Sequence, residues 1–173
     1  MILQVSQSGP SEAAGATPVD AHILIVTAPY YADVAAELMA GATEELDTRG
    51  ATYETVAVEG ALEIPQALVA AVDAGLVPRD QSSGRYDGVI VLGCVIRGET
   101  AHYDVVVNNA NHWLMQVAMD EGIPLGNAIL TVDTKEQAMR RASGGREGKG
   151  ADAVRACLGL IELRRKFLGA ESE

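Results

Sequence analysis

The chain contains 173 residues, of which 48% are apolar, and carries a formal net charge of −11 at pH 7. This length predicts a single domain with a substantial core, formed by residues 21–173 behind a mobile N-terminal arm of residues 1–20. The acidic charge disfavours nucleic acid and anionic membranes as partners, because both are themselves negatively charged. No apolar run is long enough to span a membrane, and the first residues lack the pattern of a secretory signal, so a cytoplasmic location is expected.

Apolar runs of strand type alternate with segments of helical periodicity from residue 22 onward. Strands are predicted at residues 22–30, 52–58, 87–95 and 128–132, and helices at residues 31–49, 64–74, 101–121, 134–142 and 151–168. Gly50 and Gly122 follow two of these helices, and Pro65 lies in the first turn of a third, where proline is tolerated. A polar loop is expected at residues 78–85.

Strand–helix alternation with nearly continuous apolar strands is typical of a parallel sheet that is covered on both faces. Because the crossovers between parallel strands are right-handed, we expect a flavodoxin-like, three-layer α/β/α sandwich around a four-stranded parallel sheet. Residues 2–5 (ILQV) have the composition of an extra N-terminal strand.

The two cysteines and the Gly-rich loop offer no cofactor site. Cys94 lies in the third predicted strand and Cys157 in the last helix, and both are expected to be small buried residues. No pair of His, Cys, Asp or Glu has metal-ligand spacing, so no metal site is predicted. The loop SGGREGKG is not a P-loop, because Ser143 replaces the first Gly and Gly150 follows Lys149.

Residues 93–104 (GCVIRGETAHYD) are the most informative segment. A buried strand ends at a Gly-bounded turn with Arg97 and Glu99, and a helix then opens at Thr100 with His102 in its first turn. Free N–H groups and the helix dipole attract phosphate to such a terminus. The same positive end disfavours a charged imidazole, so His102 is expected to be neutral and able to accept a proton at pH 7. This pattern predicts an enzyme that acts on a small phosphorylated substrate.

Other unusual residues follow the first two strands, where ligands of open parallel sheets bind. Tyr30 ends the first strand, and its ring can either stack on a flat heterocycle or cap the core. Glu63 follows the second strand and can either accept hydrogen bonds from a polyol or amine or complement a helix dipole. The sequence leaves both alternatives open.

Four segments together resemble the 6,7-dimethyl-8-ribityllumazine synthases, over about residues 22–168: residues 27–30 (TAPY), 60–65 (GALEIP), 93–104, and Arg141 followed by residues 148–150 (GKG). The resemblance implies a transferase of riboflavin biosynthesis that needs no cofactor. Such an enzyme condenses 5-amino-6-(D-ribitylamino)uracil with 3,4-dihydroxy-2-butanone 4-phosphate and releases phosphate and water.

The resemblance also implies roles for individual residues. His102 would transfer protons, the backbone at Glu99 and Thr100 would bind the butanone phosphate, and Arg141 and Lys149 would bind or approach the same phosphate. The pyrimidine and the ribityl chain would contact Tyr30, Ala61, Leu62, Glu63, Cys94, Val95, Ile96 and Asn127. The family more often has Phe or Trp at the position of Tyr30, Ser or Thr at that of Cys94, and an aromatic residue at that of Asn127.

The position of Asn127 predicts an oligomer. It precedes the fourth predicted strand, at the end of the sheet opposite the expected site, so it can reach substrate only in the site of a neighbouring copy. This agrees with a family of homopentamers, some of which form shells of twelve pentamers, and the resemblance also implies association with riboflavin synthase.

Two other functions remain open. A riboflavin synthase of the archaeal type shares this fold but joins two lumazine molecules and needs no phosphate site, so the turn at Glu99 and Thr100 with Arg141 argues against it. A non-catalytic relative that binds lumazine or flavin, or that only builds a shell, would not need His102.

Overall fold

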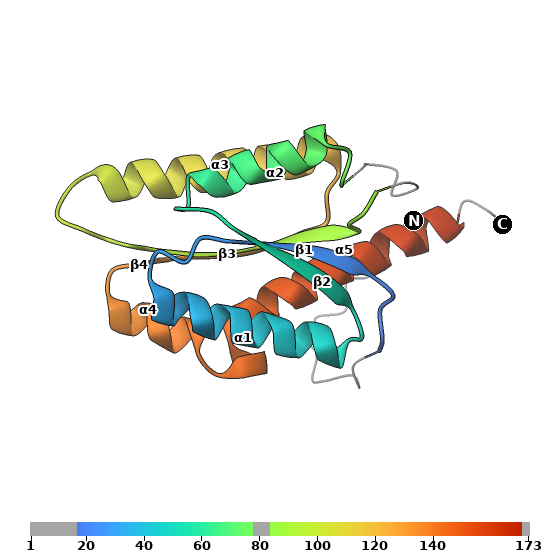
Figure 1. Cartoon of the computed structure of the whole chain (residues 1–173), viewed down its shortest axis with the longest axis horizontal. Coiled ribbons are helices and arrows are strands. Elements are labelled where there is room, and N and C mark those ends of the chain that lie inside the picture. The colour runs from blue at the N-terminus through green and yellow to red at the C-terminus, as the bar shows by residue number, and fades with distance from the viewer. Residues whose placement is uncertain (1–16, 78–83, 171–173) are drawn as a thin grey trace, which may run out of the picture.

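Four parallel strands form one sheet in the order β2-β1-β3-β4 in the computed structural model, which describes residues 17–77 and 84–170 (Figure 1). The strands are β1 (His22–Thr27), β2 (Thr52–Ala57), β3 (Gly88–Ile96) and β4 (Leu125–Val132). The helices are α1 (Ala32–Thr48), α2 (Glu63–Asp73), α3 (His102–Glu121), α4 (Lys135–Ala142) and α5 (Lys149–Ala170), with a short 3-10 helix, η1 (Gly145–Glu147), between the last two.

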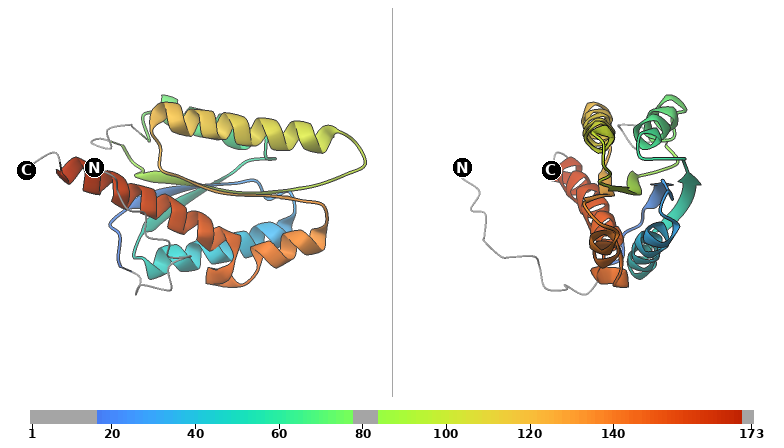
Figure 2. Two further views of the ribbon diagram at one scale, coloured as in Figure 1. Left: turned by 180° about the vertical axis from the view of Figure 1, so that it is seen from behind. Right: turned by 90° about the vertical axis from the view of Figure 1, so that its left-hand side faces the viewer.

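Helices cover both faces of the sheet, as Figure 2 shows in the end-on view. The alternation of β1 explains why: Ile23 and Ile25 pack with the buried faces of α1, α4 and α5, whereas Leu24 and Val26 pack with α2 and α3. All four side chains are almost fully buried, so both faces of this central strand need an apolar cover. The predicted three-layer α/β/α fold is confirmed.

The largest differences from the predicted bounds are at two strands: β1 ends at Thr27 rather than at residue 30, and β4 begins early. β4 begins at Leu125 rather than at residue 128, and Gly126 pairs with Ile90 of β3. A Cβ atom on Gly126 would lie 2.0 Å from the carbonyl oxygen of Ala153, so glycine here lets α5 approach the strand closely. Strand propensity is low for Gly and Asn, and for that reason the sequence pattern did not include these residues.

Residues 17–20, which were predicted to belong to the arm, contact the domain. The backbone N–H of Val19 donates to the carbonyl of Arg49 at 2.8 Å, and its side chain is buried. Residues 1–16, including the expected strand at residues 2–5, lie outside the described residues, as do residues 78–83 of the predicted polar loop. No helix among the described residues is long and apolar enough to cross a membrane.

Candidate active site

A pocket of about 320 Å³ opens at the carboxyl ends of β1, β2 and β3. β1 and β3 are neighbours in the sheet, but their connections run to opposite faces, since α1 lies on one face and α3 on the other. This is the topological switch point at which open parallel sheets bind their ligands. The pocket is lined by Tyr30, Tyr31, Gly60, Ala61, Leu62, Glu63, Cys94, Val95, Ile96, Gly98, Thr100, His102, Tyr103 and Val106.

The segment after β1 supplies two aromatic rings. Tyr30 is 73% exposed, and its ring meets that of Tyr31 edge to face with centroids 5.0 Å apart. The face of an exposed ring is free to stack on a flat heterocycle, whereas a ring that capped the core would be buried. The exposure of Tyr30 therefore favours the stacking alternative. The Tyr31 ring is partly buried. This burial is the main cause, and the nearby Tyr30 the second cause, of a raised pKa of the Tyr31 hydroxyl.

The segment after β2 forms a tight turn at the opposite wall of the pocket. The N–H of Glu63 donates to the carbonyl of Gly60 at 3.1 Å and starts α2, with Ala61 buried beneath. Glu63 is exposed, and a Cβ atom on Gly60 would lie 3.0 Å from its Oε2 atom. The glycine therefore leaves room for the carboxylate at the pocket wall, where it can accept hydrogen bonds from a polar ligand.

The end of β3 forms the floor. Cys94 is almost completely buried, whereas Val95 and Ile96 are partly exposed. The pKa of the Cys94 thiol is raised to about 11, mainly by burial and to a smaller extent by the negative charge of Asp33. The thiol therefore stays protonated at neutral pH. Cys157 is completely buried, and both cysteines are free, as the sequence predicted. The floor is thus apolar and unreactive.

The segment between β3 and α3 brings an open helix terminus to the pocket. α3 begins at His102, and its N-cap residue, Ala101, makes no side-chain capping bond. The backbone N–H of His102 donates only a long hydrogen bond, to Oγ1 of Thr100 at 3.4 Å. Backbone N–H groups at this terminus are therefore available to an anion, with the exposed imidazole of His102 beside them.

Four residues of the predicted site do not line this pocket within one chain. Glu99 is exposed in the turn, and its predicted contact is through its backbone. Asn127 is exposed on β4 and donates to Asn111 of α3 at 2.9 Å. Arg141 lies on α4, and its guanidinium bonds the carbonyl of Gln137 at 3.3 Å. Lys149 begins α5 and pairs with Asp152 at 2.6 Å.

The pocket also contains residues that the sequence analysis missed. Val106 lies four residues after His102, on the same side of α3, and Tyr103 directly follows His102. Tyr31 directly follows Tyr30. In each case the signal was the spacing from a residue already predicted. Among the described residues, no three His, Cys, Asp or Glu side chains are placed to hold a metal ion.

Comparison with known proteins agrees with this arrangement. The sequence profile of the family described as 6,7-dimethyl-8-ribityllumazine synthase matches residues 20–165. The chain belongs to this family. It is 49% identical to 6,7-dimethyl-8-ribityllumazine synthase 1 of Rhizobium meliloti over 150 residues, which cover 87% of this chain and 95% of the relative. It is 46% identical to the 6,7-dimethyl-8-ribityllumazine synthase of Agrobacterium fabrum, with 86% of this chain and 97% of the relative covered.

The match to the lumazine synthase family extends over nearly the whole chain. The 6,7-dimethyl-8-ribityllumazine synthase of Azorhizobium caulinodans is 42% identical over 164 residues, which cover 95% of this chain and 99% of the relative. The family predicted from the four sequence segments is therefore confirmed, and all three segments that line the pocket lie inside the matched region.

Proposed function

We propose that this protein condenses 5-amino-6-(D-ribitylamino)uracil with 3,4-dihydroxy-2-butanone 4-phosphate to give 6,7-dimethyl-8-ribityllumazine, phosphate and water. Membership of the lumazine synthase family supports this reaction. The observation that carries the proposal is the pocket itself, in which the exposed ring of Tyr30 and the uncapped terminus at His102 open into one space. A flat heterocycle and a phosphate can therefore be held side by side.

The reaction needs proton transfers and orientation more than a strong nucleophile. An amine attacks the ketone to form an imine, phosphate leaves by elimination, and the second amine closes the ring after a rearrangement. His102 stands where it can move the protons of these steps, because it adjoins the N–H groups that would bind the leaving phosphate. Tyr30 would hold the pyrimidine by stacking, and Glu63 would bind the ribityl chain.

We further propose that a neighbouring copy completes the site. Arg141, Lys149 and Asn127, all implied by the family resemblance, do not line the pocket of their own chain. A groove of about 660 Å³ between α2 and α3 begins beside the pocket, since Leu62 lines both. Its wall includes the exposed side chain of Trp113, and an exposed apolar groove of this kind is typical of a protein interface.

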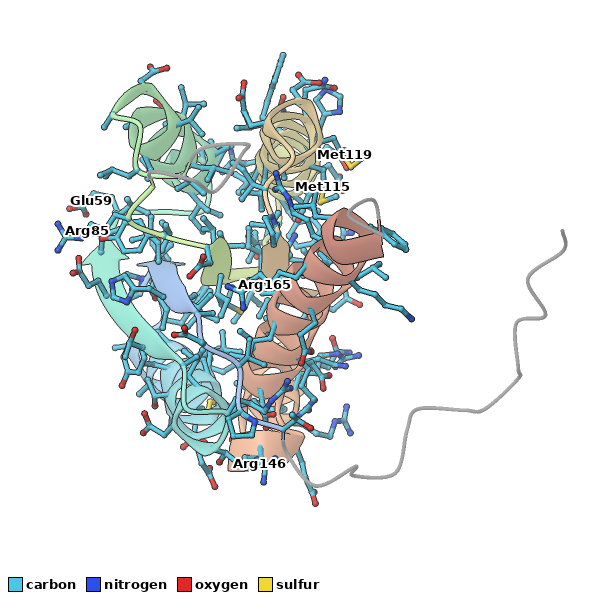
Figure 3. The ribbon with its side chains drawn as sticks, turned by 90° about the vertical axis from the view of Figure 1, so that its right-hand side faces the viewer. Glu59, Arg85, Met115, Met119, Arg146 and Arg165 are labelled. Atoms are coloured by element: carbon cyan, nitrogen blue, oxygen red, sulfur yellow. The ribbon has the colours of Figure 1, made fainter. Side chains whose placement is uncertain are left out.

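The other flank of α3 carries a second apolar surface. Met115 and Met119 are exposed and point away from α2 toward the side of the molecule where the end of α5 lies (Figure 3). Two different apolar flanks on one chain favour a head-to-tail interface, which closes into a ring. A ring of five copies, alone or within a shell, is our proposal for the assembly. Association with riboflavin synthase and a cytoplasmic location stay predictions.

The decisive experiment measures lumazine product by absorbance and fluorescence from the two purified substrates. The wild type should form product above the spontaneous rate, and the His102→Ala variant should be slower by roughly 10²-fold, because positioning still contributes once proton transfer is lost. Folded, oligomeric wild-type protein that forms no product would exclude the synthase and favour a binding or shell-forming role. Formation of riboflavin from lumazine alone would instead indicate a riboflavin synthase.

The assembly is tested with the Trp113→Asp variant, which places a charge in the groove between α2 and α3. We expect smaller particles in sedimentation and loss of product formation together, because the pocket would lose the groups supplied by the neighbour. A fully active single chain would contradict a shared site.

A further inference from the structure

Arg97 lies where three elements meet. It directly follows β3, and its backbone N–H donates to the carbonyl of Val132 at 2.9 Å, which extends the pairing of β3 with β4 by one residue. The backbone of Arg97 is therefore held by the sheet. The next residues, 98–101, form the exposed turn that leads to His102.

The guanidinium of Arg97 contacts groups on both sides of that turn. Its Nε atom donates to Oδ1 of Asp133 at 3.1 Å, and its Nη1 atom lies 3.5 Å from Oδ1 of Asp104. The guanidinium carbon is 4.1 Å from the ring centroid of Tyr103, in cation–π contact. Asp104 and Tyr103 belong to the first turn of α3, so one side chain ties this turn to the end of β4.

Asp133 extends the connection to α4. Its backbone N–H donates to Oε1 of Gln137 at 2.9 Å, and the N–H of Gln137 donates to Oγ1 of Thr134, the N-cap residue of α4, at 3.2 Å. The carbonyl of Gln137 accepts the bond from Arg141. Arg97 therefore links the turn before His102 to the first turn of the helix that carries Arg141.

The other side-chain hydrogen bond of the turn among the described residues is the long one from the N–H of His102 to Oγ1 of Thr100, at 3.4 Å. Residues 97–102 are all exposed, α3 has no side-chain N-cap, and a Cβ atom on Gly98 would meet no other atom within 4 Å. Segments with few buried contacts open at low free-energy cost. Tyr103 and Asp104 directly follow His102, and their contacts with Arg97 oppose such opening.

Arg97 does not line the pocket itself, and two carboxylates already share its charge. It is therefore suited to act through its neighbours and not as a ligand of the phosphate. We propose that Arg97 is a positioning residue, which orders residues 98–104 so that the N–H groups of the turn and His102 meet the phosphorylated substrate. This inference rests on the proposed function for its substrate.

Steady-state kinetics test the role. Arg97→Gln should raise the KM for the phosphorylated ketone about tenfold and leave the KM for the pyrimidine within about twofold, because a small displacement of the turn affects the substrate that it binds. The KM of Arg97→Lys for the ketone should lie between those of Arg97→Gln and the wild type. Lysine keeps the positive charge, but its ammonium group cannot bond two carboxylates in a plane and stack on the Tyr103 ring at the same time.

Arg85 offers a matched control at the other end of the sheet. It also pairs with a carboxylate, that of Glu54, and its guanidinium lies 5.8 Å from the Tyr86 ring centroid. Arg85→Gln should leave both KM values unchanged. Unchanged kinetics in Arg97→Gln as well, or equal effects of the two variants, would overturn the proposal.

Hydrogen–deuterium exchange of peptides covering residues 98–106 gives a readout that needs no activity. Exchange should be faster in Arg97→Gln than in the wild type and in Arg85→Gln. If the wild type makes no product, the proposed function fails, and this exchange result alone decides whether Arg97 orders the turn. Equal exchange in all three proteins would refute it.

A combined variant separates position from charge. Arg97→Gln with Asp104→Asn and Asp133→Asn removes the uncompensated carboxylates that would repel a phosphate, but it does not restore the bonds of the guanidinium. The raised KM for the phosphorylated ketone should persist in this protein. Recovery of the wild-type KM would mean that Arg97 acts only through charge, which contradicts a positioning role.

Discussion

Glu45 is a fully buried carboxylate, and its replacement is the sharpest test of how the Gly-rich loop between α4 and α5 is held. Its side chain is 2% exposed on α1, and Oε2 accepts bonds from Nε of Arg146 at 2.8 Å and from Nη1 of Arg155 at 3.0 Å. Arg146 lies on η1 and Arg155 on α5, so the pair of bonds fixes this loop to α1. The Glu45→Ala variant removes both bonds and leaves two guanidinium groups behind.

The loss of stability follows from the exposure of the partners. Removing one member of a fully buried ion pair costs about 3–5 kcal/mol. The side chains of Arg146 and Arg155 are 42% and 40% exposed and regain water, and Arg155 keeps its bond to Asp152. We therefore expect a loss of about 2–3 kcal/mol for Glu45→Ala, and about 1–2 kcal/mol for Glu45→Gln, in which neutral bonds replace charge-assisted ones.

Urea denaturation followed by circular dichroism, at a single protein concentration because assembly contributes to stability, measures these losses. The neighbouring exposed residue provides the control, and Glu44→Gln should change the unfolding free energy by no more than about 0.5 kcal/mol. If Glu45→Ala is as stable as this control, the buried ion pairs contribute nothing and the reasoning is wrong.

Three further predictions concern packing and titration. Gly126→Ala should destabilise the protein by more than about 2 kcal/mol in thermal unfolding, because its Cβ would meet a carbonyl oxygen of α5 at 2.0 Å, whereas Gly159→Ala, with open space around it, should gain up to about 1 kcal/mol. Hydrogen bonds from a tyrosine hydroxyl and from Arg85 hold the pKa of Glu54 below its ordinary value. The wild type should therefore have a larger unfolding free energy than Glu54→Gln at pH 7, and this difference should disappear as acid protonates Glu54. A difference that grew in acid would contradict this. Alkylation of Cys94 should accelerate with pH up to about 11 and show no plateau near pH 8.5.

The sequence alone was sufficient for the fold and for most of the pocket, for a physical reason. The two central strands, β1 and β3, are nearly continuous apolar runs, so the residues that follow them are easy to locate, as with Tyr30 three residues after β1 and Arg97 directly after β3. The carboxyl ends of parallel strands meet at one edge, and residues that follow different strands, such as Tyr30, Glu63 and His102, therefore come together.

Contacts between distant charges could not be predicted in this way. Glu45 lies on the buried face of α1, three residues after Ala42, and its partners lie 101 and 110 residues further along the chain. Helical periodicity places this position on the buried face, but the two arginines that compensate its charge come from the packing of η1 and α5 against α1, which no local pattern encodes. The same applies to Gly150, which would place a Cβ 2.0 Å from the carbonyl oxygen of Leu38.

Ion pairing separates the candidate cations for the phosphate into two groups. Among the described residues, Arg97, Arg146 and Lys149 are each paired with a carboxylate of their own chain. Arg141 bonds a neutral carbonyl, and no carboxylate of the described residues lies within ion-pair distance of it. An acidic protein that binds a phosphate needs a cation with an uncompensated charge. Among the described residues, Arg140 and Arg141 of α4 both meet this condition, and the family resemblance implies Arg141. Because Arg141 does not line the pocket of its own chain, strong binding of the phosphorylated ketone should require a neighbouring copy.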